Sequence, residues 1–106
     1  MSNVFELKNE NEFKEFYKKN GTQIFVFTAD WCPDCLFIKS FMPELHEKYA
    51  DYNFIYVNRD QFVELCQSMD IMGIPSFIKV RDGQGIDRFV SRLRKTKPQI
   101  DAFLAD

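Results

Sequence analysis

With 106 residues, the chain is long enough for one domain with a real core, and a composition that is 45% hydrophobic and 16% aromatic excludes an intrinsically disordered protein. A net charge of −2 gives no general attraction to nucleic acid or an anionic membrane, and no apolar run is long enough to span a bilayer. Residues 1–6 carry neither a basic nor an apolar region, so we expect no secretory signal. Three cysteines are typical of a reducing compartment, and we expect one domain, residues 1–106, in the cytoplasm.

The first third of the chain predicts a strand, a helix and a second strand. Residues 4–7 form a short apolar stretch that suits an edge strand. Asn9, with Glu12 three residues later, is typical of a helix N-cap, and Asn20-Gly21 is a helix stop. Residues 24–27 are a continuous β-branched and aromatic run, which predicts a central strand that is buried on both faces.

Two helices and a strand follow. In the first helix Pro43 predicts a kink, because proline removes a backbone hydrogen bond. Residues 54–57 predict a second buried strand, and Asp60 is a candidate cap for the next helix. The apolar face of the first helix comprises Ile38, Phe41, Met42, Leu45 and Tyr49, and that of the second comprises Phe62, Leu65, Cys66 and Met69.

The last third predicts a hairpin and a terminal helix. Residues 82–85, Asp-Gly-Gln-Gly, separate strands over 76–81 and 86–91. Thr96 and Gln99 form a capping box at the start of the final helix. The complete order is βαβαβαββα, which predicts an α/β fold with a central mixed five-stranded sheet flanked by four helices. Sites in such folds lie beyond the carboxyl ends of the strands.

A Cys-x-x-Cys segment lies at that position, directly after the predicted central strand. Cys32 would begin a helix, where free backbone N–H groups and the helix dipole favour a thiolate. Cys35, one turn later and partly covered, could attack a mixed disulfide formed at Cys32. The pair therefore predicts thiol–disulfide exchange, with an exposed Cys32 as the attacking thiol.

Other interpretations of the cysteines are a pair of small buried core residues and a metal site. Zinc needs four ligands, and only Cys66 and His46 remain as soft ligands, on different predicted helices. We therefore expect no metal. Cys66 shares the apolar face of its helix and predicts a core residue, whereas His46 is expected at the surface.

Two segments resemble signatures of the thioredoxin family. Residues 29–35, Ala-Asp-Trp-Cys-Pro-Asp-Cys, resemble its active-site segment, and residues 73–76, Gly-Ile-Pro-Ser, resemble its second motif. The element order matches along essentially the whole chain. The resemblance implies a thioredoxin-like fold and a cis Ile74–Pro75 bond beside the cysteines, with Pro75 keeping metal off the sulfurs. It also implies that Trp31 and Ile74 contact the substrate.

The chain also departs from thioredoxin proper. Thioredoxins usually have Gly-Pro between the cysteines, whereas Pro33-Asp34 here resembles cytosolic thioredoxin-related proteins with narrower substrate ranges. Thioredoxins also bury an Asp–Lys pair that helps move the proton of the resolving cysteine, and these positions are Val26 and Tyr56 here. The leading candidate for that proton is then Asp34, with Asp30 and water as alternatives. Pro33, Asp34 and Asp30 are thus expected to modulate the site.

Together these features predict a disulfide oxidoreductase that acts mainly as a reductant, without a bound cofactor. The resemblance implies disulfide-containing proteins or small disulfides as substrates, a thioredoxin reductase or another dithiol as electron donor, and a monomer. The alternative is a thioredoxin-fold module that binds a partner or senses redox state. Residues 92–97 are basic, which indicates a solvated loop or a rim that favours acidic partners.

Overall fold

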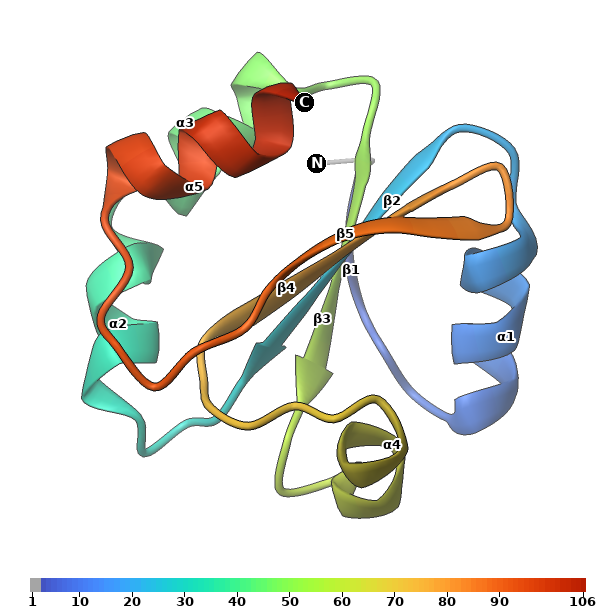
Figure 1. The fold of residues 1–106 in the computed structure, drawn as a ribbon, viewed down its shortest axis with the longest axis horizontal. Helices are drawn as coiled ribbons and strands as arrows, with labels where there is room; N and C mark the ends of the chain where they lie inside the picture. Colours follow the sequence, from blue (N-terminus) through green and yellow to red (C-terminus); the bar gives the residue numbers. More distant parts are fainter. Residues whose placement is uncertain (1–2) are drawn as a thin grey trace.

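The computed structural model describes residues 3–106; Met1 and Ser2, part of the segment in which we expect no signal, lie outside the described residues. These residues form five strands and five helices in the order β1-α1-β2-α2-α3-β3-α4-β4-β5-α5 (Figure 1). The strands are β1 (Val4–Glu6), β2 (Thr22–Thr28), β3 (Asn53–Asn58), β4 (Ser76–Arg81) and β5 (Gln84–Phe89). The helices are α1 (Glu10–Lys18), α2 (Pro33–Lys39), α3 (Met42–Lys48), α4 (Val63–Ser68) and α5 (Lys97–Ala105).

The strands form one mixed sheet in the order β1-β3-β2-β4-β5. β1, β3 and β2 run parallel, whereas β4 is antiparallel to both β2 and β5. Helices α2, α3 and α5 cover one face of the sheet, and α1 and α4 cover the other (Figure 1). The predicted α/β class, the mixed five-stranded sheet and the edge position of the first strand are confirmed.

Strand β2 is the centre of the fold. Residues 22–27 are all buried, because β2 lies between β3 and β4 and both of its faces are covered by helices. Phe25 and Phe27 pack into the core with α1 and α4, and Ile24 and Val26 pack into the core with α3 and α5. This two-sided burial is the reason that the strand is a continuous apolar run, and its carboxyl end leads directly to the cysteines.

The predicted four helices become five, because the kinked helix is two separate helices. α2 ends at Lys39 and α3 begins at Met42. Pro43 has no N–H to donate to the carbonyl of Lys39, so it ends the first helix. It is tolerated in the first turn of α3, where backbone N–H groups have no helical acceptor anyway.

The predicted helix caps at Asn9 and Thr96 are confirmed, whereas the predicted start of the last strand differs by two residues. Asn9 accepts a hydrogen bond from the amide of Glu12 at 2.9 Å, and Thr96 and Gln99 form the predicted capping box. The hairpin turn is shorter than predicted, so β5 begins at Gln84 instead of residue 86. Asp82 and Gly83 have φ values of 52° and 82°, which suits the two-residue turn that matches the twist of a hairpin.

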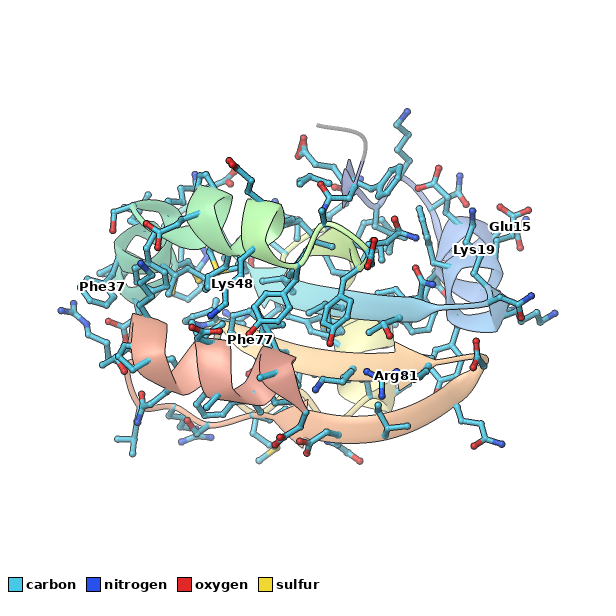
Figure 2. All side chains as sticks on the ribbon, turned by 90° about the horizontal axis from the view of Figure 1, so that it is seen from above. Glu15, Lys19, Phe37, Lys48, Phe77 and Arg81 are labelled. Atoms are coloured by element: carbon cyan, nitrogen blue, oxygen red, sulfur yellow. The ribbon has the colours of Figure 1, made fainter. Side chains whose placement is uncertain are left out.

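Charged side chains hold α5 to its neighbours. Lys48 on α3 pairs with Asp101 at 2.8 Å, and Figure 2 shows it between the two helices. The buried Lys79 on β4 donates to the carbonyl of Phe103, near the end of α5, where free carbonyls attract a cation. Among residues 3–106 no helix is long and apolar enough to cross a membrane.

Cys66 packs in the core between α4 and the sheet, as predicted, with 3% of its surface exposed. We expect Cys66→Ala to lower the free energy of unfolding by about 1 kcal/mol through lost packing, and to leave disulfide reduction unchanged. Cys66→Ser should cost more, because it buries a hydroxyl in an apolar cluster. Urea unfolding of both variants measures the difference. A loss of reductase activity in a folded Cys66→Ala protein would contradict this assignment.

Candidate active site

Cys32 is the N-cap of α2, so its sulfur is part of the helix start. Its Sγ accepts a hydrogen bond from the amide of Cys35 at 3.2 Å, and its carbonyl accepts one from Leu36 at 3.1 Å. Pro33 occupies the first turn of the helix, where no donor is lost. The arrangement places the sulfur against the backbone N–H groups at the start of α2.

The second motif lies against Cys32. The Ile74–Pro75 bond is cis, as the resemblance implies, and the carbonyl of Ile74 accepts from Cys32 Sγ at 3.7 Å. Ile74 also packs on both cysteines and on Ala29. This contact corrects the expectation of an exposed Cys32, whose surface is only 4% exposed, against 2% for Cys35.

Cys35 is held as a neutral thiol. Burial raises its pKa to about 12, and the hydrogen bond and charge of Cys32 and the charge of Asp34 act in the same direction. A hydrogen bond to the backbone of Ala29 opposes them. Because this pKa is far above neutrality, Cys35 must lose a proton before it can attack a disulfide.

Trp31 is exposed beside Cys32, and residues of the loop after β3 hold its ring. Its Nε1 donates to Asp60 Oδ2 at 2.7 Å, and the guanidinium of Arg59 lies 5.0 Å from its ring centroid. Asp60 therefore positions Trp31 and does not cap α4 as predicted, since the N-cap of α4 is Phe62, which makes no side-chain cap bond. The sequence predicts no contact of Arg59 or Asp60 with Trp31.

The loop before Pro75 is pressed against the loop after β5. A Cβ atom on Gly73 would collide with the carbonyl of Ser91, so the two backbones meet at a distance that only glycine allows. Lys95 Nζ donates to Ser91 O at 3.1 Å and to Leu93 O at 3.3 Å. Its side chain is 1% exposed, and burial lowers its pKa. The interpretation of residues 92–97 as a solvated loop is therefore wrong for Lys95.

Asp34 makes an ion pair on the outer side of α2. Its Oδ1 accepts from Arg94 Nε at 2.8 Å, and Arg94 also lies 4.5 Å from the ring centroid of Phe37 (Figure 2 labels Phe37). The basic loop thus supplies a partner for the Asp34 carboxylate.

Behind the cysteines is a cavity of about 440 Å³. Cys35, Asp30, His46 and Tyr56 line it, and Asp34 does not. The prediction of a surface His46 is wrong, because His46 is 8% exposed and its Nε2 lies 2.7 Å from the hydroxyl of Tyr56. Within residues 3–106, no three His, Cys, Asp or Glu side chains gather as metal ligands would.

The contact at Gly73 generates a steric prediction. Gly73→Ala should lower the free energy of unfolding by about 2 kcal/mol, because two backbone segments must separate to admit a methyl group. The same shift should slow disulfide reduction, since it moves the carbonyl of Ile74 away from Cys32. Ser91→Ala, which keeps the Ser91 carbonyl, is the control. Equal stability of the two variants in urea unfolding would show that the backbone contact is unimportant.

The charge of Asp34 generates a prediction about Cys35. Because a nearby negative charge disfavours a thiolate, Asp34→Asn should lower the pKa of Cys35. Loss of the exposed ion pair with Arg94 should cost at most about 1 kcal/mol of stability. A carbon-13 NMR titration of the Cys35 Cβ measures the pKa, with Asp30→Asn as the comparison. A larger shift in Asp30→Asn would contradict the assignment.

Comparisons with known proteins agree with this geometry. The thioredoxin family profile matches residues 3–106. The chain is 31% identical to an H-type thioredoxin of Brassica oleracea over 94 residues, which are 89% of this chain and 74% of that protein. It is 37% identical to the mitochondrial thioredoxin-2 of Schizosaccharomyces pombe over 70 residues, 66% of this chain and 53% of that protein.

The thioredoxin of Malassezia sympodialis has the same fold. It superposes with a TM-score of 0.84 over 96% of this chain and 90% of that one, at 22% identity. The family profile covers Cys32, Cys35 and the cis Pro75. The chain therefore belongs to the thioredoxin family, whose members are thiol–disulfide oxidoreductases.

Proposed function

We propose that the protein reduces disulfides in other proteins or in small molecules. The observation that carries the proposal is the sulfur of Cys32, which accepts from the Cys35 amide at the start of α2 and faces the cis Pro75 loop. Once deprotonated, a sulfur in this position is a nucleophile and a leaving group, because backbone N–H groups at a helix start point toward it. Trp31, Ile74 and Pro75 then form the surface that an extended substrate meets.

The reaction has two exchange steps. The Cys32 thiolate attacks one substrate sulfur, so that a mixed disulfide forms and the other substrate sulfur leaves as a thiolate. Cys35 then loses its proton and attacks Cys32, which closes the Cys32–Cys35 disulfide and releases the second substrate thiolate. The substrate gains two electrons and the two cysteines lose them. A thioredoxin reductase or another dithiol returns those electrons.

We propose the cytoplasm as the compartment and a monomer as the working form. An odd number of cysteines, with Cys66 placed in the core, supports a reducing environment. The alternative function is a partner-binding or redox-sensing module. The low exposure of Cys32 favours it, because access to the sulfur then depends on movement of the Ile74 loop.

Reduction of insulin by the protein with thioredoxin reductase, compared with dithiothreitol as donor, separates these two functions. We expect turnover with at least one donor. We also expect Cys35→Ser to accumulate mixed disulfides with its partners, because the resolving thiol is gone, whereas Cys32→Ser should accumulate few. Thiol trapping followed by non-reducing electrophoresis measures this. Abundant trapping by Cys32→Ser, or preferential alkylation of Cys35 in the reduced parent, would show that the roles are reversed.

A further inference from the structure

The cavity behind Cys35 joins the buried thiol to a second pair of titratable side chains. Cys35 from α2, His46 from α3 and Tyr56 from β3 all line it. Its volume of about 440 Å³ holds several water molecules, each of which occupies roughly 30 Å³ in the liquid. Exposed Glu6 and Lys39 also line it, so solvent reaches the interior. A proton that leaves Cys35 on this side therefore enters a solvent-accessible space that titratable side chains line.

His46 and Tyr56 are held as a unit inside this space. Their side chains lie 2.7 Å apart, His46 Nε2 to Tyr56 Oη, with the rings at 89°. Asn3 Nδ2 donates to the His46 carbonyl at 3.0 Å, and the imidazole packs on Phe54 with ring centroids 4.7 Å apart. Two side chains of β3 thus fix a ring that a surface histidine would leave free.

We propose that Tyr56 and His46 take up the Cys35 proton, through the water of this cavity, when Cys35 resolves a mixed disulfide. The inference rests on the proposed function and names the residues that serve its second step. The proton reaches Tyr56 through water and reaches His46 through Tyr56. Because both residues act on Cys35 through another group, they are positioning residues.

The proton moves from Cys35 to His46 by way of water and the Tyr56 hydroxyl. Water carries the proton of the Cys35 thiol to Tyr56 Oη, and the Tyr56 hydroxyl passes its own proton to His46 Nε2. This requires the tautomer with hydrogen on Nδ1, in which Nε2 is the acceptor. The Cys35 thiolate then forms the bond to Cys32 Sγ, and the bond from Cys32 to the substrate sulfur breaks with its electron pair on the substrate. The imidazolium returns the proton to cavity water.

The ionisation of the pair suits this role. Burial lowers the pKa of His46 below its ordinary value of 6.5, so the ring is neutral at neutral pH and has a nitrogen free to accept. The same burial disfavours the imidazolium, so His46 holds the proton only briefly before returning it to water. Burial raises the pKa of Tyr56, which keeps its hydroxyl protonated and able to donate. The other titratable groups on the cavity are Glu6 from β1, Asp30 from the loop after β2 and Lys39 from α2.

Asp34, which the sequence favours for this proton, is engaged by Arg94 and does not line the cavity. Val26, which lies on β2 in the adjacent core, can neither accept nor donate a proton. The carboxylates of Asp30 and Glu6 also line the cavity and could compete as acceptors. Asp30 is two residues from Cys32 in sequence, and the experiment therefore includes it.

The test separates the two exchange steps with a chromogenic aromatic disulfide, 5,5′-dithiobis(2-nitrobenzoate), as substrate. Attack by Cys32 releases one coloured thiolate, and resolution by Cys35 releases the second. In stopped-flow measurements at neutral pH, Tyr56→Phe should leave the first release unchanged. It should slow the second by about tenfold, less than the 10²–10⁴ typical of a positioned acid or base, because solvent water also reaches the cavity.

Two further variants keep the result interpretable. His46→Gln should slow the second release as Tyr56→Phe does, although it retains hydrogen-bonding capacity. Tyr49→Phe is the matched control, because Tyr49 also donates its hydroxyl from a half-buried site, to Asp101, but does not line the cavity. It should leave both releases unchanged. Thermal unfolding verifies that each variant is folded.

The pH profile distinguishes proton transfer from a purely structural effect. The parent should lose its advantage over Tyr56→Phe at acid pH, where His46 is already protonated, and in the alkaline range, where hydroxide removes the thiol proton directly. A structural defect would slow the second release by the same factor at every pH. That outcome, an unchanged second release, or slowing by Asp30→Asn alone would overturn the inference. Absence of the first release in the parent would instead overturn the proposed function.

Discussion

The sulfur of Cys32 has two physical roles, and the rest of the site depends on their combination. It is the hydrogen-bond acceptor that caps α2, and it is the atom placed to attack a disulfide. The hydrogen bond and charge of Cys32 also help to raise the pKa of Cys35. When Cys32 is in a mixed disulfide, its sulfur cannot carry a negative charge, so no such charge opposes ionisation of Cys35. The first exchange step therefore makes Cys35 easier to deprotonate for the second.

The loops opposite Cys32 are held by contacts between backbones. Gly73 admits the carbonyl of Ser91, and the buried ammonium of Lys95 satisfies that carbonyl from the other side. A charged group so fully buried is tolerated because it is hydrogen-bonded and stays close to the acids and thiols of the site. These contacts link the Ile74 loop to Ser91 and, through Lys95, to the residues just before α5. They hold the carbonyl of Ile74 beside Cys32.

Most of the fold and the cysteine pair follow from local sequence. The run at 24–27, the caps at Asn9 and Thr96 and the Cys-x-x-Cys spacing depend on neighbours a few residues away, so periodicity and spacing reveal them. The errors have a different cause. His46 is buried by a partner on β3, and Lys95 by carbonyls of its own folded loop, and neither contact leaves a periodic signal. Pro43 indicates a lost backbone hydrogen bond but not the angle between the segments on its two sides. The sequence therefore predicts one kinked helix where the structure has two.

The absence of an ionisable group at Val26 changes the electrostatics of resolution. A carboxylate buried in the apolar core beside β2 would carry a large desolvation cost, whereas a neutral hydrogen-bonded pair such as His46 and Tyr56 does not. A neutral acceptor also adds no negative charge that would oppose the thiolates of Cys32 and Cys35. Its positive charge appears only after it has taken the proton, at the moment when Cys35 becomes an anion. The charges that develop in this step therefore have opposite signs on the two sides of one cavity, and their attraction offsets part of the cost that burial imposes on a protonated His46.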